Sequence, residues 1–269
     1  MTARGDVPPG VDPTVPSAGR LYDLFLGGDQ HFEVDRMAAE IIRKTAPEVE
    51  DGAWANRGFL QRSARWMALE AGIDQFLDIG AGLPTRNNTH EAAQSANPDA
   101  RTVYVDNDPM VYAHARSLLE GVQNVALIMG DIRRPDAVLG DAELRRLIDF
   151  ERPVGLVLAA VLHFVGDADD PWGIVRRYMD ALPSGSYLAL SHGALDKGDP
   201  RVAERVQQVY RNATEQLYIR TRPEIERFFD GLELVPPYKG APAEVTTTGL
   251  WGAEDPDLAE SDGSRWALC

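Results

Sequence analysis

The chain has 269 residues, enough for one α/β domain with an added cap and a full hydrophobic core. Its 42 acidic and 27 basic residues give a net charge of −15, which argues against nucleic acid as a partner. The single cysteine, Cys269, excludes an internal disulfide and a thiolate zinc cluster, and no convincing Asp/Asn set suggests another metal. No apolar run approaches the ~20 residues of a membrane span and no signal-peptide core is present, so we expect a cytoplasmic protein.

The first 72 residues predict an arm followed by a helical cap. Residues 1–16 are proline-rich with few apolar anchors, which predicts a flexible arm. Residues 17–72 are expected to form the cap. Ser17 should begin a helix that ends at Phe25, and apolar spacing predicts two more helices, over 33–45 and 51–70.

Residues 73–269 alternate between strand and helix patterns, which predicts an α/β core with a parallel sheet and helices on both faces. Five buried strands are expected, over 75–79, 101–105, 125–129, 153–160 and 182–191. Aspartate–proline pairs should open helices at Asp108, Asp170 and Asp199, the last running to about Gln216. Residues 232–235 and 264–268 are expected to pair as the last two strands, joined by a polar loop over 244–262.

A glycine turn follows the first strand. Gly80, Ala81 and Gly82 allow the backbone to turn sharply and lie close to a ligand, and Pro84 is pre-set to open a helix. Asp78 precedes this turn, where a dinucleotide site usually has an apolar residue. A carboxylate there suits an ammonium group better than a pyrophosphate, so the amino-acid end of S-adenosylmethionine fits this turn better than a nicotinamide dinucleotide.

The next two strands also end in carboxylates. Asp106 follows the second strand and can accept hydrogen bonds from ribose hydroxyls, with Asn107 beside it at the adenosine or in the turn. Asp131 follows the third strand, where it can hold an adenine amino group while Ile132 packs on the ring. Three acidic strand ends in succession are together a stronger signal than any one of them.

These motifs resemble a class I S-adenosylmethionine-dependent methyltransferase, and more narrowly a largely uncharacterised actinobacterial methyltransferase family. The matching segments are residues 17–28 (SAGRLYDLFLGG), 56–60 (NRGFL), 80–85 (GAGLPT), 104–109 (YVDNDP) and 161–165 (VLHFV). The resemblance implies a Rossmann-like, seven-stranded, mostly parallel sheet with an antiparallel last strand, and S-adenosylmethionine as cofactor. It does not identify the methyl acceptor.

The resemblance also suggests roles for residues near the methyl group. Residues 80–86 are similar to the turn of leucine carboxyl methyltransferases, in which an arginine before the first strand binds the cofactor carboxylate, so Arg57 is a candidate. Ala159 and Ala160 are small enough to leave room for the methyl group. His163 is the candidate general base, although it could equally be packed beside Leu162 and Phe164, and His192 is a weaker candidate. The cap of residues 17–72 is expected to close over the cofactor and the acceptor, with Tyr22 or Phe32 in contact with these ligands.

We therefore expect methyl transfer by in-line displacement to an unidentified acceptor, most simply a small molecule, with no obligatory acid/base pair because the sulfonium is already activated. Methylation of a protein stays open. The alternatives are a non-catalytic sensor of S-adenosylmethionine and, less favoured, a nicotinamide-dependent oxidoreductase.

Overall fold

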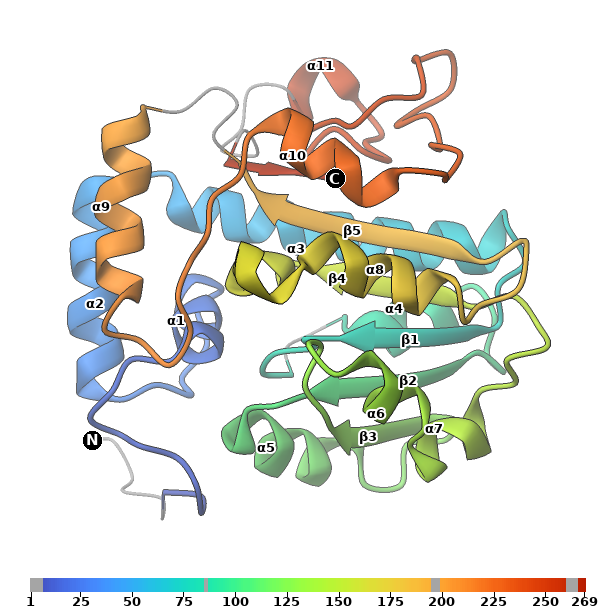
Figure 1. Cartoon of the computed structure of the whole chain (residues 1–269), viewed down its shortest axis with the longest axis horizontal. Coiled ribbons are helices and arrows are strands. Elements are labelled where there is room, and N and C mark those ends of the chain that lie inside the picture. Colours follow the sequence, from blue (N-terminus) through green and yellow to red (C-terminus); the bar gives the residue numbers. More distant parts are fainter. Residues whose placement is uncertain (1–6, 85–86, 195–198, 260–265) are drawn as a thin grey trace.

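The computed structural model describes residues 7–84, 87–194, 199–259 and 266–269. Its centre is a six-stranded sheet in the order β3-β2-β1-β4-β5-β6 (Figure 1). The strands are β1 (Gln75–Ile79), β2 (Arg101–Asp106), β3 (Val125–Met129), β4 (Gly155–Ala159), β5 (Tyr187–Gly193) and β6 (Ala267–Leu268). The first five pair in parallel and β6 is antiparallel to β5, which confirms the Rossmann-like, mostly parallel arrangement with an antiparallel last strand.

The predicted seventh strand is absent from the described residues. Residues 232–235 are not a strand; Leu234 instead packs its side chain on the main hydrophobic core. The partner of β6 on its other side comes from the predicted loop, where Thr247 forms an antiparallel bridge to Leu268. The expected last strand also began too early, since β6 starts at Ala267 and residues 264 and 265 lie outside the described part.

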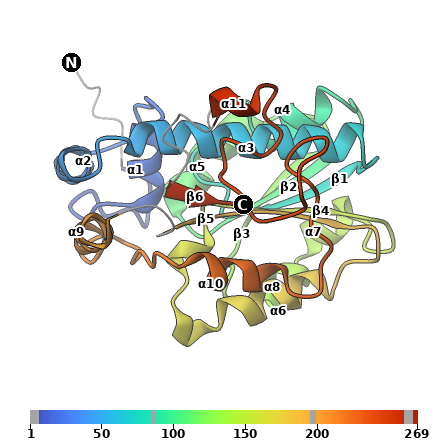
Figure 2. The same cartoon turned by 90° about the horizontal axis from the view of Figure 1, so that it is seen from above.

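Helices cover both faces of the sheet (Figure 2). One face carries α3 (Val49–Leu69) and α4 (Thr89–Gln94), and the other carries α6 (Pro135–Leu139), α7 (Ala142–Leu147), α8 (Pro171–Met179) and α10 (Arg222–Glu226). Helix α5 (Pro109–Leu119) packs beside β3, and the short α11 (Pro256–Ala259) lies near the C-terminus. The expected caps are confirmed: the carboxylates of Asp108, Asp170 and Asp199 each accept a backbone N–H of the helix that follows.

A third group of helices stands at the carboxyl ends of the parallel strands: α1 (Ala18–Phe25), α2 (Glu33–Thr45) and α9 (Pro200–Tyr210) (Figure 1). Helices α1 and α2 have the predicted bounds. Helix α9 ends six residues earlier than predicted, because the chain turns away after Tyr210 and the Thr214 N–H donates to the carbonyl of Pro16 at 2.8 Å. Residues 211–219 therefore form a loop beside the strand ends.

A buried ion pair joins α1 to α2. Arg20 is 2% exposed and Asp35 is 0% exposed, and the Arg20 Nε lies 2.8 Å from the Asp35 carboxylate. That carboxylate also accepts the backbone N–H groups of Ser17 and Phe32. The Arg20 guanidinium in turn donates to the carbonyl of Val15 and lies over the Phe32 ring. Asp35 thus fixes the start of α1, the start of α2 and the segment before them.

Replacing Asp35 with alanine should destabilise the fold strongly, because a buried guanidinium would lose its counter-charge. We expect a loss of about 3–5 kcal/mol in the free energy of unfolding, measured by urea denaturation. The control is Glu40→Ala on the same helix, whose ion pair with Lys44 is exposed to solvent and should contribute far less. Equal losses in the two variants would contradict the role assigned to Asp35.

Candidate functional site

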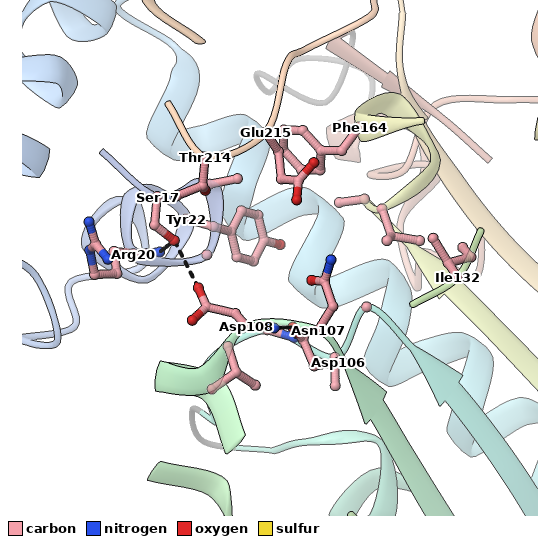
Figure 3. Close-up of a pocket in the computed structure, with 18 of the residues that line it drawn as sticks. Ser17, Arg20, Tyr22, Asp106, Asn107, Asp108, Ile132, Phe164, Thr214 and Glu215 are labelled. Atoms are coloured by element: carbon pink, nitrogen blue, oxygen red, sulfur yellow. Dashed lines mark hydrogen bonds between the residues drawn. The ribbon is translucent and has the colours of Figure 1, made fainter. Parts of the chain in front are cut away.

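A cavity of about 330 Å³ opens at the carboxyl ends of the parallel strands (Figure 3). Its walls come from four places: the loops after β1, β2, β3 and β4, the start of α1 with the segment before it, one stretch of α3, and the end of α9 with the loop that follows. This is the edge at which open α/β sheets bind their ligands, and the volume is at the lower end for small-molecule sites.

The glycine turn after β1 is required by its geometry. Gly80 has φ +75°, and a Cβ atom there would come within 2.2 Å of the Val161 side chain. The backbone N–H groups of Gly80 and Ala81 donate to the carbonyl of Val105, at 2.8 and 3.3 Å. Gly82 has φ +65° and open space where its Cβ would be. The turn therefore brings bare backbone to the cavity wall.

The helix that should follow this turn begins later than Pro84 predicted. Residues 83 and 84 are not helical, residues 85 and 86 lie outside the described part, and α4 starts at Thr89. Its start is set by a capping box, in which the Asn88 side chain accepts a backbone N–H and Glu91 accepts the N–H of Asn88. A reciprocal cap satisfies two free donors, which a proline at the first position cannot do.

Asp78 lies at the end of β1, 3% exposed, and lines the cavity. Its carboxylate accepts a hydrogen bond from the Thr89 hydroxyl at 2.5 Å. Burial raises the pKa of Asp78 to about 6, against the lowering effects of Thr89 and of the Arg57 charge. Arg57, from α3, also lines the cavity and donates from Nη2 to the Asn88 side chain at 2.8 Å. The two predicted residues are thus brought to one wall.

Asp106 ends β2 and bridges two turns. One carboxylate oxygen accepts the Gly82 N–H at 2.8 Å and the other accepts the Asp108 N–H at 2.9 Å. Burial raises the pKa of Asp106 to about 6 although these N–H groups act in the opposite direction. A carboxylate oxygen can accept more than one hydrogen bond, so Asp106 stays available to hydroxyl groups in the cavity that it lines.

Asp131, the carboxylate that follows the third strand, is hydrogen-bonded to its neighbour Arg133. Asp131 accepts the backbone N–H and the Nε–H of Arg133, each at 2.9 Å. Burial tends to raise the pKa of Asp131, but these contacts with Arg133 outweigh it and lower the value. Ile132 lines the cavity beside it, 8% exposed. The Asp131 carboxylate therefore stays ionised beside the end of β3.

Asn107 is faced across the cavity by a residue that no local sequence pattern indicated. This residue is Glu215, from the loop after α9; burial raises its pKa, and the charge of Arg133, whose Nη1 lies 3.9 Å from the glutamate, acts in the opposite direction. In Figure 3, Glu215 and Thr214 lie on the side of the cavity opposite Asn107 and Asp106. The shortened α9 is what allows this loop to reach the strand ends.

His163 and Ala159 line the cavity after β4. The His163 Nδ1 accepts the backbone N–H of Gly193 at 3.2 Å, and Phe164 packs edge-on against the ring. Burial, and secondarily the charge of Arg220, lower the pKa of His163 to about 3. The ring is therefore neutral at physiological pH. His192, the weaker candidate, is fully buried behind it and is not part of the cavity wall.

Tyr22 reaches the cavity from α1, whereas Phe32 is not part of its lining. The Tyr22 hydroxyl accepts a hydrogen bond from Asn56 at 2.8 Å and donates to the carbonyl of Ala53 at 3.2 Å. Asn56 also accepts the Ser191 hydroxyl of β5, and Ser191 accepts the N–H of Ala160 at 2.9 Å. These side-chain contacts, which sequence reasoning missed, tie α1, α3 and β5 to the end of β4.

The start of α1 is attached to the sheet side by one more contact. The Ser17 hydroxyl donates to the Asp108 carboxylate at 3.0 Å, and Asp108 also caps α5 (Figure 3). With the Thr214–Pro16 hydrogen bond, this contact brings residues 16 and 17 between the loop after α9 and the strand ends. The cavity is thus covered by segments far apart in the sequence.

The S-adenosyl methyltransferase family profile matches residues 5–263, nearly the whole chain. The chain belongs to this family. Among solved structures it is similar to a candidate methyltransferase of Thermobifida fusca YX, with 43% identity, a TM-score of 0.86 and coverage of 97% of this chain and 95% of that one. It is also similar to a DUF574 family protein of Streptomyces avermitilis, with 39% identity, a TM-score of 0.86 and 96% coverage of both chains. No curated protein matches it in sequence.

Membership confirms a methyltransferase with S-adenosyl-L-methionine as its cofactor, and it decides against the nicotinamide alternative. The cavity suits this cofactor chemically: two buried carboxylates and a glycine turn offer acceptors and bare backbone to a cationic nucleoside. Within the described ranges no helix is long and apolar enough to cross a membrane, and no cluster of three or more His, Cys, Asp or Glu side chains could hold a metal.

The raised pKa of Asp78 predicts how the stability of the ligand-free protein depends on pH. A carboxyl with a pKa of about 6 in the folded protein and about 4 when unfolded binds its proton more tightly in the fold, so its contribution to stability falls as the pH rises from 4 through 6. At pH 8 the ligand-free Asp78→Asn variant should therefore be more stable than the parent by on the order of 2 kcal/mol, and this gain should shrink at pH 5. Asparagine keeps an acceptor for Thr89.

If Asp78 faces the ammonium group of S-adenosylmethionine, as the sequence predicts, the same substitution should weaken cofactor binding at least tenfold, because it removes that charge. Thermal melts at pH 5 and pH 8 and calorimetric titration at pH 8 measure the two effects. The control is Asp99→Asn, an exposed position before β2, which should change neither. Undiminished cofactor affinity in Asp78→Asn would contradict the assignment.

Proposed function

We propose that this chain transfers the methyl group of S-adenosylmethionine to a small molecule by direct in-line displacement, inside the cavity at the strand ends. The observation that carries the proposal is the continuity of this cavity. One wall holds the buried carboxylates of Asp78 and Asp106, and another holds aromatic side chains, namely Tyr22, Phe164 and Tyr210. A polar end suited to a nucleoside and an aromatic end suited to an organic acceptor share one enclosed space.

We assign the cofactor end as follows. Asp106 accepts the ribose hydroxyls, and Asp78 faces the ammonium group. Arg57 faces the carboxylate of the amino-acid end. The backbone of Gly80, Ala81 and Gly82 lies against the same end, where their lack of bulk permits close approach.

The adenine end is assigned to the residues after β2 and β3. Asp131 accepts from the exocyclic amino group, and Ile132 packs on the ring. Asn107 lies beside the adenosine, and Glu215 lines the opposite side of the cavity. Ala159 flanks the methyl group, where a larger side chain would occupy the path of the acceptor.

When bound, S-adenosylmethionine supplies a methyl group on a positively charged sulfur, which is an activated electrophile. The chain's own contribution is then to position the acceptor and to exclude water. We assign the second task to the cap formed by residues 17–72, with Tyr22 at the ligand, and to the loop after α9. Both close the cavity through the contacts of Ser17 and Thr214.

An enclosed site of about 330 Å³ argues for a small acceptor rather than a folded macromolecule. The net charge of −15 argues in the same direction against nucleic acid. A protein substrate would have to insert a side chain past both covering segments. The small-molecule acceptor is therefore the reading that the geometry supports best.

The first test is calorimetric titration with S-adenosylmethionine, S-adenosylhomocysteine and NAD. We expect micromolar binding of the first two, no binding of NAD, and at least tenfold weaker binding in Asp106→Asn, in which an amide N–H₂ replaces one acceptor oxygen. The matched control is Asp141→Asn, an aspartate outside the cavity. Binding of NAD alone would overturn the assignment.

The second test uses cell extract from an actinobacterium, separated by size into a small-molecule fraction and a macromolecular fraction. Formation of S-adenosylhomocysteine with the small-molecule fraction, and loss of it in Asp106→Asn, is the expected result. Product formation with the macromolecular fraction alone would contradict the small-molecule proposal.

A further inference from the structure

The protonation state of His163 is determined by its neighbours. Its Nδ1 lies 3.2 Å from the backbone nitrogen of Gly193, and a backbone N–H always carries its hydrogen. Nδ1 is therefore the acceptor in this contact and bears no proton. In the neutral ring the proton must then reside on Nε2.

Contacts of Arg220 and His192, on the side of the His163 ring away from the cavity, fix the position of Gly193. Arg220 is 3% exposed, and its Nη1 lies 2.7 Å from the Nε2 of His192. Because a guanidinium only donates, His192 accepts at Nε2 and carries its proton on Nδ1, which donates to the Gly193 carbonyl at 2.7 Å. Gly193 thus receives a hydrogen bond at its carbonyl and gives another to His163.

Arg220 itself is locked in place. Its Nη2 donates to the carbonyl of Val165 at 2.8 Å and to the Asp167 carboxylate at 2.7 Å, and its Nη1 also donates to the carbonyl of Leu162 at 3.1 Å. These contacts hold the segment that carries His163. The charge of Arg220 is also the one that lowers the pKa of His163, after burial. The local field behind the ring is therefore positive.

This geometry makes His163 a hydrogen-bond donor and a poor base. To take a proton at Nδ1 it would have to give up the Gly193 N–H, and at Nε2 it already holds one. Among the described residues no acceptor is bonded to Nε2, and the ring lines the cavity. Its N–H is thus available to a molecule bound there.

The other groups near His163 do not supply a base. Tyr22 and Tyr210 line the aromatic end, and burial raises the pKa of both phenols, which keeps them neutral donors. Glu215, whose pKa burial also raises, lies 3.9 Å from the Arg133 guanidinium at the adenosine end of the cavity. Asp78 is bonded to Thr89 at the amino-acid end. Because the Tyr22 hydroxyl already donates to the carbonyl of Ala53, an acceptor at the aromatic end meets the N–H of His163 and the O–H of Tyr210 as donors.

We propose that the acceptor is an aromatic or similarly planar acid whose attacked oxygen is already an anion when it binds, as a carboxylate or the conjugate base of an acidic phenol or enol, and that the Nε2–H of His163 donates a hydrogen bond to this oxygen. This inference rests on the proposed function. An oxygen anion has several lone pairs, so one can accept from His163 while another attacks. A neutral amine has a single pair, which this donor would occupy.

The transfer then balances without a proton. An oxygen lone pair forms the O–CH₃ bond while the S–CH₃ bond breaks and its electrons stay on sulfur. The sulfonium becomes a neutral thioether, and the oxyanion becomes a neutral ester or ether. Nothing is left for a base to remove, which agrees with the state of His163.

The test uses 4-nitrophenol, whose anion absorbs visible light, in the presence of sinefungin, a cationic analogue that cannot transfer a methyl group. We expect the bound dye to be the phenolate, with its ionisation constant raised at least tenfold relative to free dye. This shift should vanish in His163→Phe, persist in part in His163→Gln, which keeps an amide N–H, and be unchanged in His114→Phe, a control on α5 outside the cavity.

Sinefungin binding is measured first, by calorimetry. If sinefungin does not bind, both the proposed function and this inference are wrong. If sinefungin binds but the dye is excluded or bound as the neutral phenol, the oxyanion inference alone is overturned. Should His163→Phe fail to fold, ¹⁵N NMR of the wild-type histidines decides: a neutral, Nε2-protonated His163 at pH 5 supports the inference, and a charged or Nδ1-protonated ring overturns it.

Discussion

The hydrogen bond from the Gly82 N–H to the Asp106 carboxylate ties together the first two strand ends, and the rest of the site is arranged around it. It requires a turn with two positive φ angles, which glycine supplies, and a carboxylate buried at the tip of β2. Burying Asp106 and Asp78 side by side opposes ionisation, as their raised pKa values record. The fold thus holds two buried carboxylates whose ionisation lowers its stability, which is the conflict between stability and function expected at a binding site.

Local patterns in the sequence were sufficient for much of the fold. The five parallel strands, the helices α1 and α2 and the aspartate caps of α5, α8 and α9 each depend on residues within a few positions of one another. One error was local: Thr89 and not Pro84 begins α4, because Asn88 and Glu91, three positions apart, cap it reciprocally. The other arose where distant contacts decide. Residues 232–235 alternate like a strand because Leu234 packs on the core, while the actual neighbour of β6 is Thr247, in the predicted loop.

The residues of the site also fall into those that local sequence could predict and those that it could not. Asp78 and Gly80 could be picked out because they are two positions apart at the end of one strand, and Asp106 because it follows the next strand along the chain. Their partners could not. Ser191 reaches Asn56 across 135 positions, and Arg220 reaches His192 across 28. The role of His163 shows the consequence: its position after β4 suggested a base, whereas its protonation is fixed by Gly193 and Arg220, which no spacing rule connects to it.

The cover over the cavity also bears on how fast bound molecules can leave. Two peptide hydrogen bonds attach the loop after α9, one from Thr214 to the segment before α1 and one from Tyr218 to the carbonyl of His163. Each is worth about 1 kcal/mol net, so releasing the loop costs far less than disturbing the sheet. Because both donors are backbone N–H groups, proline at either position would remove one attachment and shorten the time that a molecule stays in the cavity.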